Sequence, residues 1–252
     1  MNLLSSLRKE LLEAWRSKRF LVAVVLLGVF GMMSPLLARF MREIFTAVPG
    51  AEMFSAMIPE PTSMDAIAQY VKNIEQFGIL LALLLSMGLV AVEKERGTAA
   101  LMLCKPLGRG NFILSKFLGV TALLLVALLV AALGGWYYTY YLFEPLPMGA
   151  WLALNGAMLL VFLVVAAITL LFSTLFNSQA AAAGAGLGTY LLISLLGSSP
   201  TLAPYTPGYL VNWGVGLFNG GTETAWASLG VCLGLIVISQ TTACLVFKRQ
   251  EL

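Results

Sequence analysis

The sequence predicts an all-α membrane protein with six transmembrane helices, an amphipathic helix ahead of them and a short cytoplasmic helix between the second and third. Hydrophobic residues make up 60% of the 252 residues and charged residues only 11%. The mean hydropathy is +0.90. This composition leaves too little polar surface for a soluble domain of such length. Several uncharged stretches also approach or exceed the length that spans a bilayer.

We expect the whole chain, residues 1–252, to form a single transmembrane domain. The six predicted spans are residues 20–37, 77–92, 117–143, 148–176, 179–197 and 226–247. The second is short, and we expect it to start a turn or more upstream, where Ile74 and Gln76 can lie at the membrane interface. The first is not a cleavable signal peptide, because no small-residue cleavage site follows it.

Lysine and arginine are distributed unevenly between the two sides of the predicted membrane. Of the 15, five precede the first span, five lie between the second and third spans, and two close the chain. Cytoplasmic loops are enriched in these residues. Both termini and segment 93–116 are therefore predicted to be cytoplasmic, and segments 38–76 and 198–225 extracytoplasmic. We expect a multi-pass protein of a prokaryotic cytoplasmic membrane, in contact with lipid and with no nucleic-acid partner.

Residues 1–19 have the pattern of an amphipathic helix. The apolar stripe repeats every four residues and consists of Leu3, Leu7, Leu11 and Trp15. Ser5, Lys9 and Glu13 lie on the opposite face. A basic helix with such a stripe lies along the membrane surface. It can be a generic positive anchor ahead of the first span, or an interfacial elbow that packs beside the helix bundle.

The extracytoplasmic segments are rich in residues that break helices. Segment 198–225 combines many Pro, Gly and aromatic residues with no Lys or Arg, so it is too apolar for a free loop. Non-helical backbone near lipid must be buried in protein or line water. A short re-entrant or interfacial hairpin is one interpretation, and aromatic anchoring at the headgroups is the other. Segment 38–76 is long enough for a small cap.

The fifth span begins with a run of small residues. Ala180, Gly184 and Gly188 fall on one helical stripe, along which a second helix can approach closely. We predict a helix-packing face, with a dimer contact or a conduit as alternatives.

The sequence lacks the residues that several classes of function require. The six spans as drawn contain no Asp, Glu, Lys or Arg, whereas proton relays and ion-coupled carriers carry such groups within the membrane. The chain has no His, and Cys104, Cys232 and Cys244 form no paired framework. No phosphate-binding loop, zinc motif or nucleophile elbow is present. We therefore expect no catalytic residues, no metal site and no ion coupling, with energy supplied by another polypeptide.

The most polar stretch in the middle of the chain lies between the second and third spans. Residues 93–96 would continue the second span as a charged extension, Gly97 weakens that helix, and Thr98 can begin a new one. Residues 99–104 then form a short helix too apolar to lie comfortably in water, and Pro106 ends it. Such a helix suits a groove on a soluble partner.

This stretch resembles a loop of known transporters. Its order is Glu-x-Glu-x-Gly-Thr, a Leu-rich turn, Pro-Leu-x-Arg and Ile-Leu-x-Lys-x-Leu-Gly. It is similar to the loop between spans two and three in the permeases of type-2 ATP-binding-cassette (ABC) exporters. The resemblance is to the small six-span branch, which includes multidrug, antibiotic-resistance and sodium exporters and the permease for nitrous oxide reductase maturation. The order of elbow, spans and Pro/aromatic segment is similar along the whole chain.

The resemblance implies a coupling helix at about residues 98–104 that binds a cleft of a separate cytoplasmic ABC ATPase. Two permeases, as a homodimer or a related heterodimer, and two ATPases would form the complex. ATP and Mg²⁺ would bind to the ATPase, so this chain would hold no cofactor and would not be an enzyme. The residues expected to couple to the ATPase are Glu93, Glu95, Gly97, Thr98, Leu101, Met102, Leu103, Pro106 and Arg109. The dimer seam could use the first or the fifth span.

Three functions remain open from the sequence. The first is ATP-driven export of a hydrophobic or amphipathic solute, since an uncharged conduit offers little to an ion. The second is mechanotransmission, in which the subunit relays ATPase motion to an extracytoplasmic accessory protein without moving a solute. The third is a membrane structural role independent of any ATPase.

Overall fold

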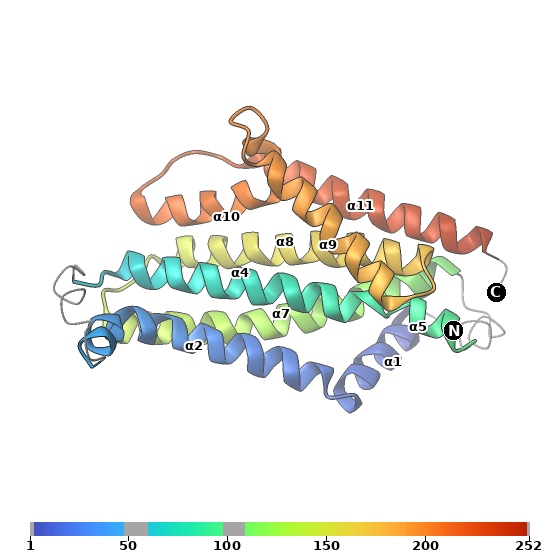
Figure 1. Ribbon diagram of the computed structural model, residues 1–252, viewed down its shortest axis with the longest axis horizontal. Helices are drawn as coiled ribbons and strands as arrows, with labels where there is room; N and C mark the ends of the chain where they lie inside the picture. The colour runs from blue at the N-terminus through green and yellow to red at the C-terminus, as the bar shows by residue number, and fades with distance from the viewer. Residues whose placement is uncertain (1–2, 48–59, 98–108, 251–252) are drawn as a thin grey trace.

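The computed structural model describes residues 3–47, 60–97 and 109–250, which form an elongated bundle of α-helices (Figure 1). In chain order the helices are α1 (Leu3–Arg16), α2 (Arg19–Thr46), α4 (Ser63–Met87), α5 (Ala91–Glu95), α7 (Arg109–Leu142), α8 (Met148–Leu175), α9 (Gln179–Leu196), α10 (Pro207–Gly216) and α11 (Trp226–Arg249). Within the described part, six helical stretches are long and apolar enough to cross a membrane. The predicted all-α fold with six spans is confirmed.

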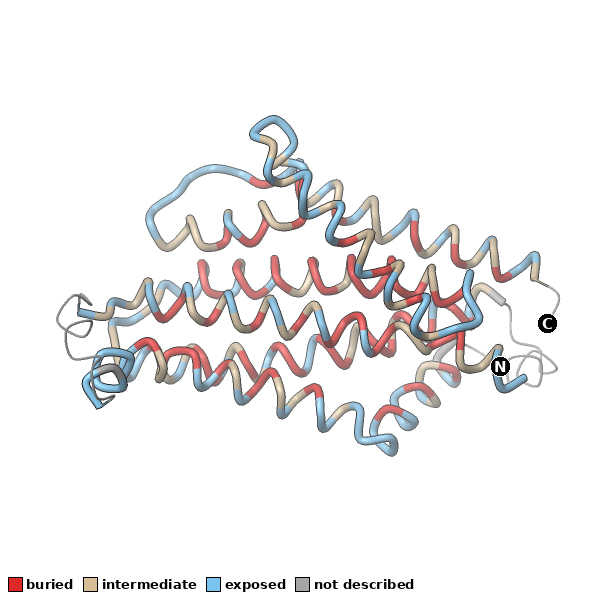
Figure 2. Tube along the Cα trace, viewed as in Figure 1, coloured by how far each residue is buried: buried red, intermediate tan, exposed pale blue. Residues whose placement is uncertain are grey.

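Helix α8 lies at the centre of the bundle. It is the most buried of the six spans, whereas α9 and α11 are the least buried. Figure 2 shows the buried residues concentrated where α4, α7 and α8 face one another, with exposed residues along the outer helices. Both described ends of the chain, Leu3 and Gln250, lie at the same end of the bundle (Figure 1), which we call the terminal end.

Glycine allows the long helices to approach one another closely. A Cβ on Gly31 of α2 would lie 2.6 Å from the carbonyl oxygen of Ala131 in α7 and 2.8 Å from its Cα. These are backbone atoms, so only a residue without a side chain fits at this crossing. Gly78 of α4 also lies at a close crossing, where its neighbour is the side-chain ring of Phe162 in α8. Small residues at such crossings maximise van der Waals contact where lipid gives no hydrophobic drive.

Polar side chains join helices inside the bundle. The Tyr70 hydroxyl of α4 donates to Asn155 Oδ1 of α8 at 2.7 Å. The Asn73 amide of α4 donates to the Ser34 hydroxyl of α2 at 2.9 Å. Each bond satisfies a polar group that would otherwise face hydrocarbon. Together they fix α4 between α2 and α8.

Helix α4 begins 14 residues before the predicted second span, so it includes charged residues that the span as drawn left out. Thr62 and Asp65 form a capping box: the Thr62 hydroxyl accepts from the Asp65 N–H, and the Asp65 carboxylate accepts from the Thr62 N–H. This cap starts the helix at Ser63, well ahead of the apolar run. Lys72 and Glu75 therefore lie within the helix that crosses the membrane.

The second span is broken near the terminal end. Helix α4 ends at Met87, a turn follows, and α5 continues from Ala91 to Glu95. Gly97 has a φ of 67°, in the left-handed region that glycine adopts without strain, so the helix ends there as expected. On the other side of residues 98–108, α7 is already helical at Arg109, eight residues before the predicted start of the third span.

The fifth span packs through a different stripe from the predicted one. Gly186 faces α8, where a Cβ would lie 2.6 Å from the Thr169 hydroxyl oxygen, and Ala182 is fully buried. No such neighbour lies within 4 Å of a Cβ placed on Gly184 or Gly188, and Ala180 is exposed. The stripe of Ala180, Gly184 and Gly188 is thus not the close contact within this chain. Its pairing with a second copy stays a prediction.

Segment 198–225 folds back onto the bundle. After α9 it forms the short helix α10, whose Leu210 and Val211 are buried. Gly214 lies close to the α8 backbone, with a Cβ position 2.9 Å from Leu154 Cα. The Ser228 hydroxyl of α11 donates to the Thr206 carbonyl at 2.6 Å. The segment therefore packs against α8 and α11, as the hairpin interpretation expects, and aromatic anchoring at the headgroups stays a prediction.

Replacing Gly31 by Ala should destabilise the bundle by about 1–3 kcal/mol, the usual range for overpacking. The added methyl would meet the backbone of α7, which cannot rotate away. A lower thermal midpoint of the purified protein in detergent would report the effect. Gly156→Ala is the matched control, because a Cβ on Gly156 meets nothing within 4 Å. Equal midpoints for the two variants would contradict this account of the α2–α7 crossing.

Candidate functional site

The candidate site is a buried charge cluster at the terminal end of the bundle, built around Lys116 of α7. The Lys116 ammonium lies 2.8 Å from Glu93 Oε1 of α5 and 3.3 Å from Glu10 Oε1 of α1. Its side chain is only 2% exposed, and those of Glu10 and Glu93 are 10% and 14% exposed. We call Lys116, Glu10 and Glu93 the Lys116 cluster. It joins three helices that are far apart in sequence.

Lys9 extends the cluster toward the surface. Its ammonium lies 3.7 Å from Glu10, 3.7 Å from Glu13 and 3.8 Å from Glu93. The Lys9 side chain is 34% exposed, so these longer contacts are screened by solvent and contribute little. The strong part of the cluster is the buried pair of carboxylates on Lys116. Ion pairs of this kind are strongly destabilised when one partner is removed.

Helix α1 packs on α7 through its small and polar residues. Ser6 and Ser115 share a hydrogen bond between their hydroxyls at 2.8 Å. Gly119 of α7 lies against the Glu10 side chain, with a Cβ position 3.2 Å from Glu10 Cβ. On the other face, Leu11 is 39% and Trp15 is 67% exposed. Helix α1 thus packs beside the bundle with Leu11 and Trp15 exposed, and the contact of the apolar stripe with lipid stays a prediction.

Helix α5 is held by the end of α8. The Ser173 hydroxyl oxygen accepts hydrogen bonds from the backbone N–H groups of Val90 and Ala91, both at 3.1 Å. The Lys94 ammonium donates to the Thr174 carbonyl at 2.8 Å. The two bonds to Ser173 satisfy backbone N–H groups left open by the break between α4 and α5, and the Lys94 bond satisfies a carbonyl near the end of α8. They also fix the helix that carries Glu93.

The last helix reaches the cluster through aromatic rings. Phe112 of α7 stacks on Phe247 of α11, with centroids 5.1 Å apart. The Lys116 ammonium lies 4.9 Å from the centroid of the Phe112 ring, within range of a cation–π interaction. The beginning of α7 is therefore in contact with α1, α5 and α11.

The structure places the predicted coupling residues in three different situations. Glu93 is turned into the Lys116 cluster, whereas Glu95 and Gly97 are exposed at the end of α5. Arg109 opens α7. Thr98, Leu101, Met102, Leu103 and Pro106 lie outside the described residues, so the coupling helix stays a prediction. Of the predicted interfacial stripe, Leu3 lies in α1, and Leu7 is partly buried.

Sequence reasoning missed Glu10 and Lys94 and treated Lys116 as part of the cytoplasmic loop. Lys116 lies in the second turn of α7, on the side where α1 packs. One signal was available: Ser6, Glu10 and Ala14 repeat every four residues on α1, as a second stripe of small or polar groups. All three are buried in the structure. The described residues contain no group of three His, Cys, Asp or Glu side chains arranged for a metal.

Comparison with known proteins identifies the class of membrane protein. A family model described as "ABC-2 family transporter protein" matches residues 4–252. The chain therefore belongs to the ABC-2 family of transporter proteins, as the resemblance of residues 93–119 predicts. This makes it a multi-pass membrane protein of the ABC permease type. Membership implies, in general, an ATPase partner and a dimeric assembly.

Three curated proteins are similar to this chain, and two of them are described as ABC transporter permeases. The chain is 28% identical over 198 residues to the "uncharacterized transmembrane protein YxlG" of Bacillus subtilis, which covers 76% of this chain and 75% of that protein. It is 32% identical over 193 residues to the "probable ABC transporter permease protein NosY" of Pseudomonas aeruginosa, covering 75% and 66%. The protein with the same description from Stutzerimonas stutzeri is 32% identical over 123 residues, covering 49% and 40%.

Lys116→Met should loosen α1 from the bundle. The substitution keeps an unbranched side chain but leaves Glu10 and Glu93 without their shared buried cation, a loss of about 3–5 kcal/mol for buried ion pairs. Hydrogen exchange of the α1 amides should speed up, and the thermal midpoint should fall. Lys9→Met is the matched control, because an exposed pair contributes about 0–1 kcal/mol. Equal exchange in the two variants would show that Lys116 does not hold α1.

Proposed function

We propose that this chain is the permease subunit of an ABC exporter, which couples ATP hydrolysis by a separate subunit to export of a solute across the cytoplasmic membrane. Two copies of the chain would assemble with two ATPase subunits. ATP and Mg²⁺ would bind to the ATPase, and the permease would have no catalytic residue of its own. Family membership and the six apolar spans support this proposal.

The observation that carries the proposal is the ion pair between Glu93 and Lys116. Residues 98–108, which include the predicted coupling helix, are flanked by α5 on one side and α7 on the other. Glu93 and Lys116 join these two helices at 2.8 Å. A force applied to the intervening segment would therefore reach both helices together. Through Glu10 it would also reach α1.

The orientation follows from charge. Twelve of the 15 Lys and Arg residues lie in the N-terminal segment, in residues 93–116 or at the C-terminus, and both described ends meet at the terminal end (Figure 1). The positive-inside rule supports a cytoplasmic location for that end. An ATPase in the cytoplasm would then approach the terminal end, beside the Lys116 cluster.

Mechanotransmission is the alternative function. Helix α10 lies against α8, with Gly214 beside Leu154, and Ser228 of α11 is bonded to Thr206 just before α10. Movement of α8 and α11 would therefore displace this segment, which could act on an extracytoplasmic partner. Crosslinks from residues 198–225 to an external protein, in vesicles that accumulate no solute, would favour this alternative over export.

Replacing Leu101 and Leu103 together by Glu should abolish binding of the ATPase. Each carboxylate would have to lose water in the proposed apolar contact, at a cost of several kcal/mol. The measurement is copurification with a co-expressed ABC ATPase, together with ATP turnover of the complex. Leu202→Glu is the control, since it adds the same charge to an exposed leucine of segment 198–225. Full copurification and full turnover of the double variant would disprove the docking role.

A further inference from the structure

A chain reversal after α10 brings Glu223 back against that helix. Helix α10 ends at Gly216, and Gly220 follows with a φ of 74°, in the left-handed region that suits glycine. The Gly221 N–H then donates to the Gly216 carbonyl at 3.0 Å. A Cβ on Gly221 would lie 2.9 Å from that carbonyl oxygen, so the turn leaves no room for a side chain there. The residues that follow, which include Glu223, therefore run back alongside α10.

Glu223 holds two aromatic side chains of α10. Tyr209 and Trp213 are four residues apart and so lie on one face of the helix. The Tyr209 hydroxyl donates to Glu223 Oε2 at 3.2 Å, and the Trp213 indole N–H donates to the Glu223 carbonyl at 2.7 Å. Both aromatic residues also pack against a buried apolar cluster that includes Leu210. The two rings and the acidic residue are therefore fixed relative to one another.

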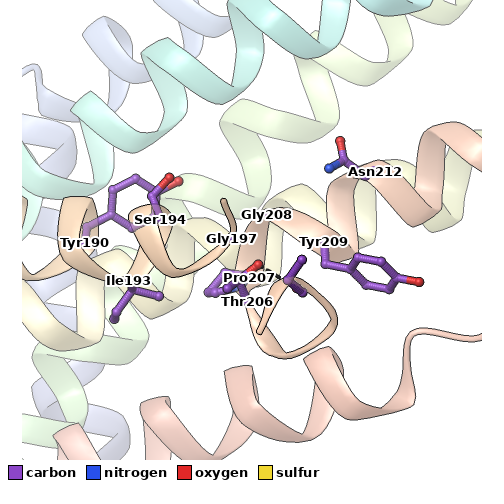
Figure 3. A pocket seen from close by; sticks show the side chains of 10 residues that line it. Tyr190, Ile193, Ser194, Gly197, Thr206, Pro207, Gly208, Tyr209 and Asn212 are labelled. Carbon is purple, nitrogen blue, oxygen red and sulfur yellow. Dashed lines mark hydrogen bonds between the residues drawn. The ribbon is translucent and has the colours of Figure 1, made fainter. Parts of the chain in front are cut away.

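These three residues line one cavity. It has a volume of about 250 Å³, and its wall consists of Tyr209, Asn212, Trp213, Gly216, Gly221 and Glu223. A second cavity of about 200 Å³ lies between α9 and α10 and shares Tyr209 and Asn212 with the first. Figure 3 shows both of these side chains on α10. The first cavity thus combines one acidic and two aromatic residues, and a more polar cavity adjoins it.

The cavity wall carries a negative charge that is not balanced by a nearby cation of the described chain. Segment 198–225 contains no Lys or Arg, and Glu223 is its only charged residue. No salt bridge within 4.0 Å joins Glu223 to a lysine or arginine in residues 3–47, 60–97 and 109–250. A helix C-terminus also carries partial negative charge, and α10 ends at Gly216 in the cavity wall. The cavity therefore favours a cation.

We infer that the cavity lined by Tyr209, Trp213 and Glu223 binds an organic ammonium group. The aromatic rings offer cation–π contacts and apolar surface for the alkyl substituents, and the carboxylate offers the opposite charge. The orientation proposed above would place this site outside the cytoplasm. The inference goes beyond the proposed export function, because it requires neither an ATPase nor a solute pathway. The ammonium group can belong to a free solute or to a lipid headgroup, and the test separates these two sources.

The test compares choline with 3,3-dimethylbutan-1-ol, a neutral alcohol of the same shape in which carbon replaces the ammonium nitrogen. Saturable binding of each to the purified full chain, in nanodiscs of phosphatidylglycerol, is measured by saturation-transfer NMR. Choline should bind more tightly than the alcohol. Glu223→Gln should weaken choline binding about fivefold, as expected for an exposed charge contact, and should leave binding of the alcohol unchanged. Glu223→Asp keeps the charge and should bind choline more tightly than Glu223→Gln.

Further variants test the aromatic part of the site. Tyr209→Leu should weaken choline binding about two- to fivefold, the range of an exposed cation–π contact, whereas Tyr209→Phe keeps the ring and should retain most of the affinity. Glu144→Gln removes an exposed carboxylate outside the cavity and should have no effect. Weaker choline binding in nanodiscs of phosphatidylcholine would identify the lipid headgroup as the ligand, and unchanged binding would identify a free solute. Equal wild-type affinity for choline and the alcohol, or equal choline affinity of wild type and Glu223→Gln, would overturn the inference.

Discussion

The buried Lys116 ammonium at the terminal end needs carboxylates in contact with it, and the packing of the surrounding helices supplies them. Lys116 is 2% exposed, and removing such an ion from water costs several kcal/mol. Glu10 and Glu93 offset that cost from two separate segments. The positions of α1, α5 and α7 are therefore mutually dependent. The dependence extends to α8 through Ser173 and to α11 through Phe247.

The hydropathy of the sequence is enough to locate the six spans, but it does not show at which residue each helix begins. An apolar run ends at the first charged residues, so the second span as drawn starts at Phe77, although its helix was expected to begin a turn or more upstream. The structure instead starts α4 at the capping box of Thr62 and Asp65, a local hydrogen-bond signal that is visible in the sequence but outweighed by Lys72 and Glu75. The same bias assigned Lys116 to a loop, although α7 already includes it. Helix ends are set by caps and partners rather than by apolarity.

The Lys116 cluster was predictable only in part. Glu93 was recognised from the local motif, but its partners depend on contacts across 23 residues to Lys116 and on the 106 residues that separate Lys116 from Glu10. The periodicity of the sequence shows which face of a helix is apolar, but it does not show which other helix packs against a given face. For α1 it gave an apolar stripe, of which Leu11 and Trp15 are exposed in the structure, and left open which of its other faces meets α7. The small stripe of α9 shows the same limit, because Gly186 and not Gly184 meets α8.

The helical stretch of the second span carries several charged residues, and their surroundings differ along its length. Glu93 shares Lys116 with Glu10 near the terminal end, whereas Glu75 lies within α4 and forms no salt bridge with another described residue. Between them the helix is broken after Met87, and Ser173 bonds both Val90 and Ala91 beyond the break. Under the proposed function, α5 would follow the ATPase, because Glu93 joins it to α7 on the other side of the predicted coupling segment. Beyond the break, the charged end of this span is held by α8 through Ser173 and by α7 through Lys116.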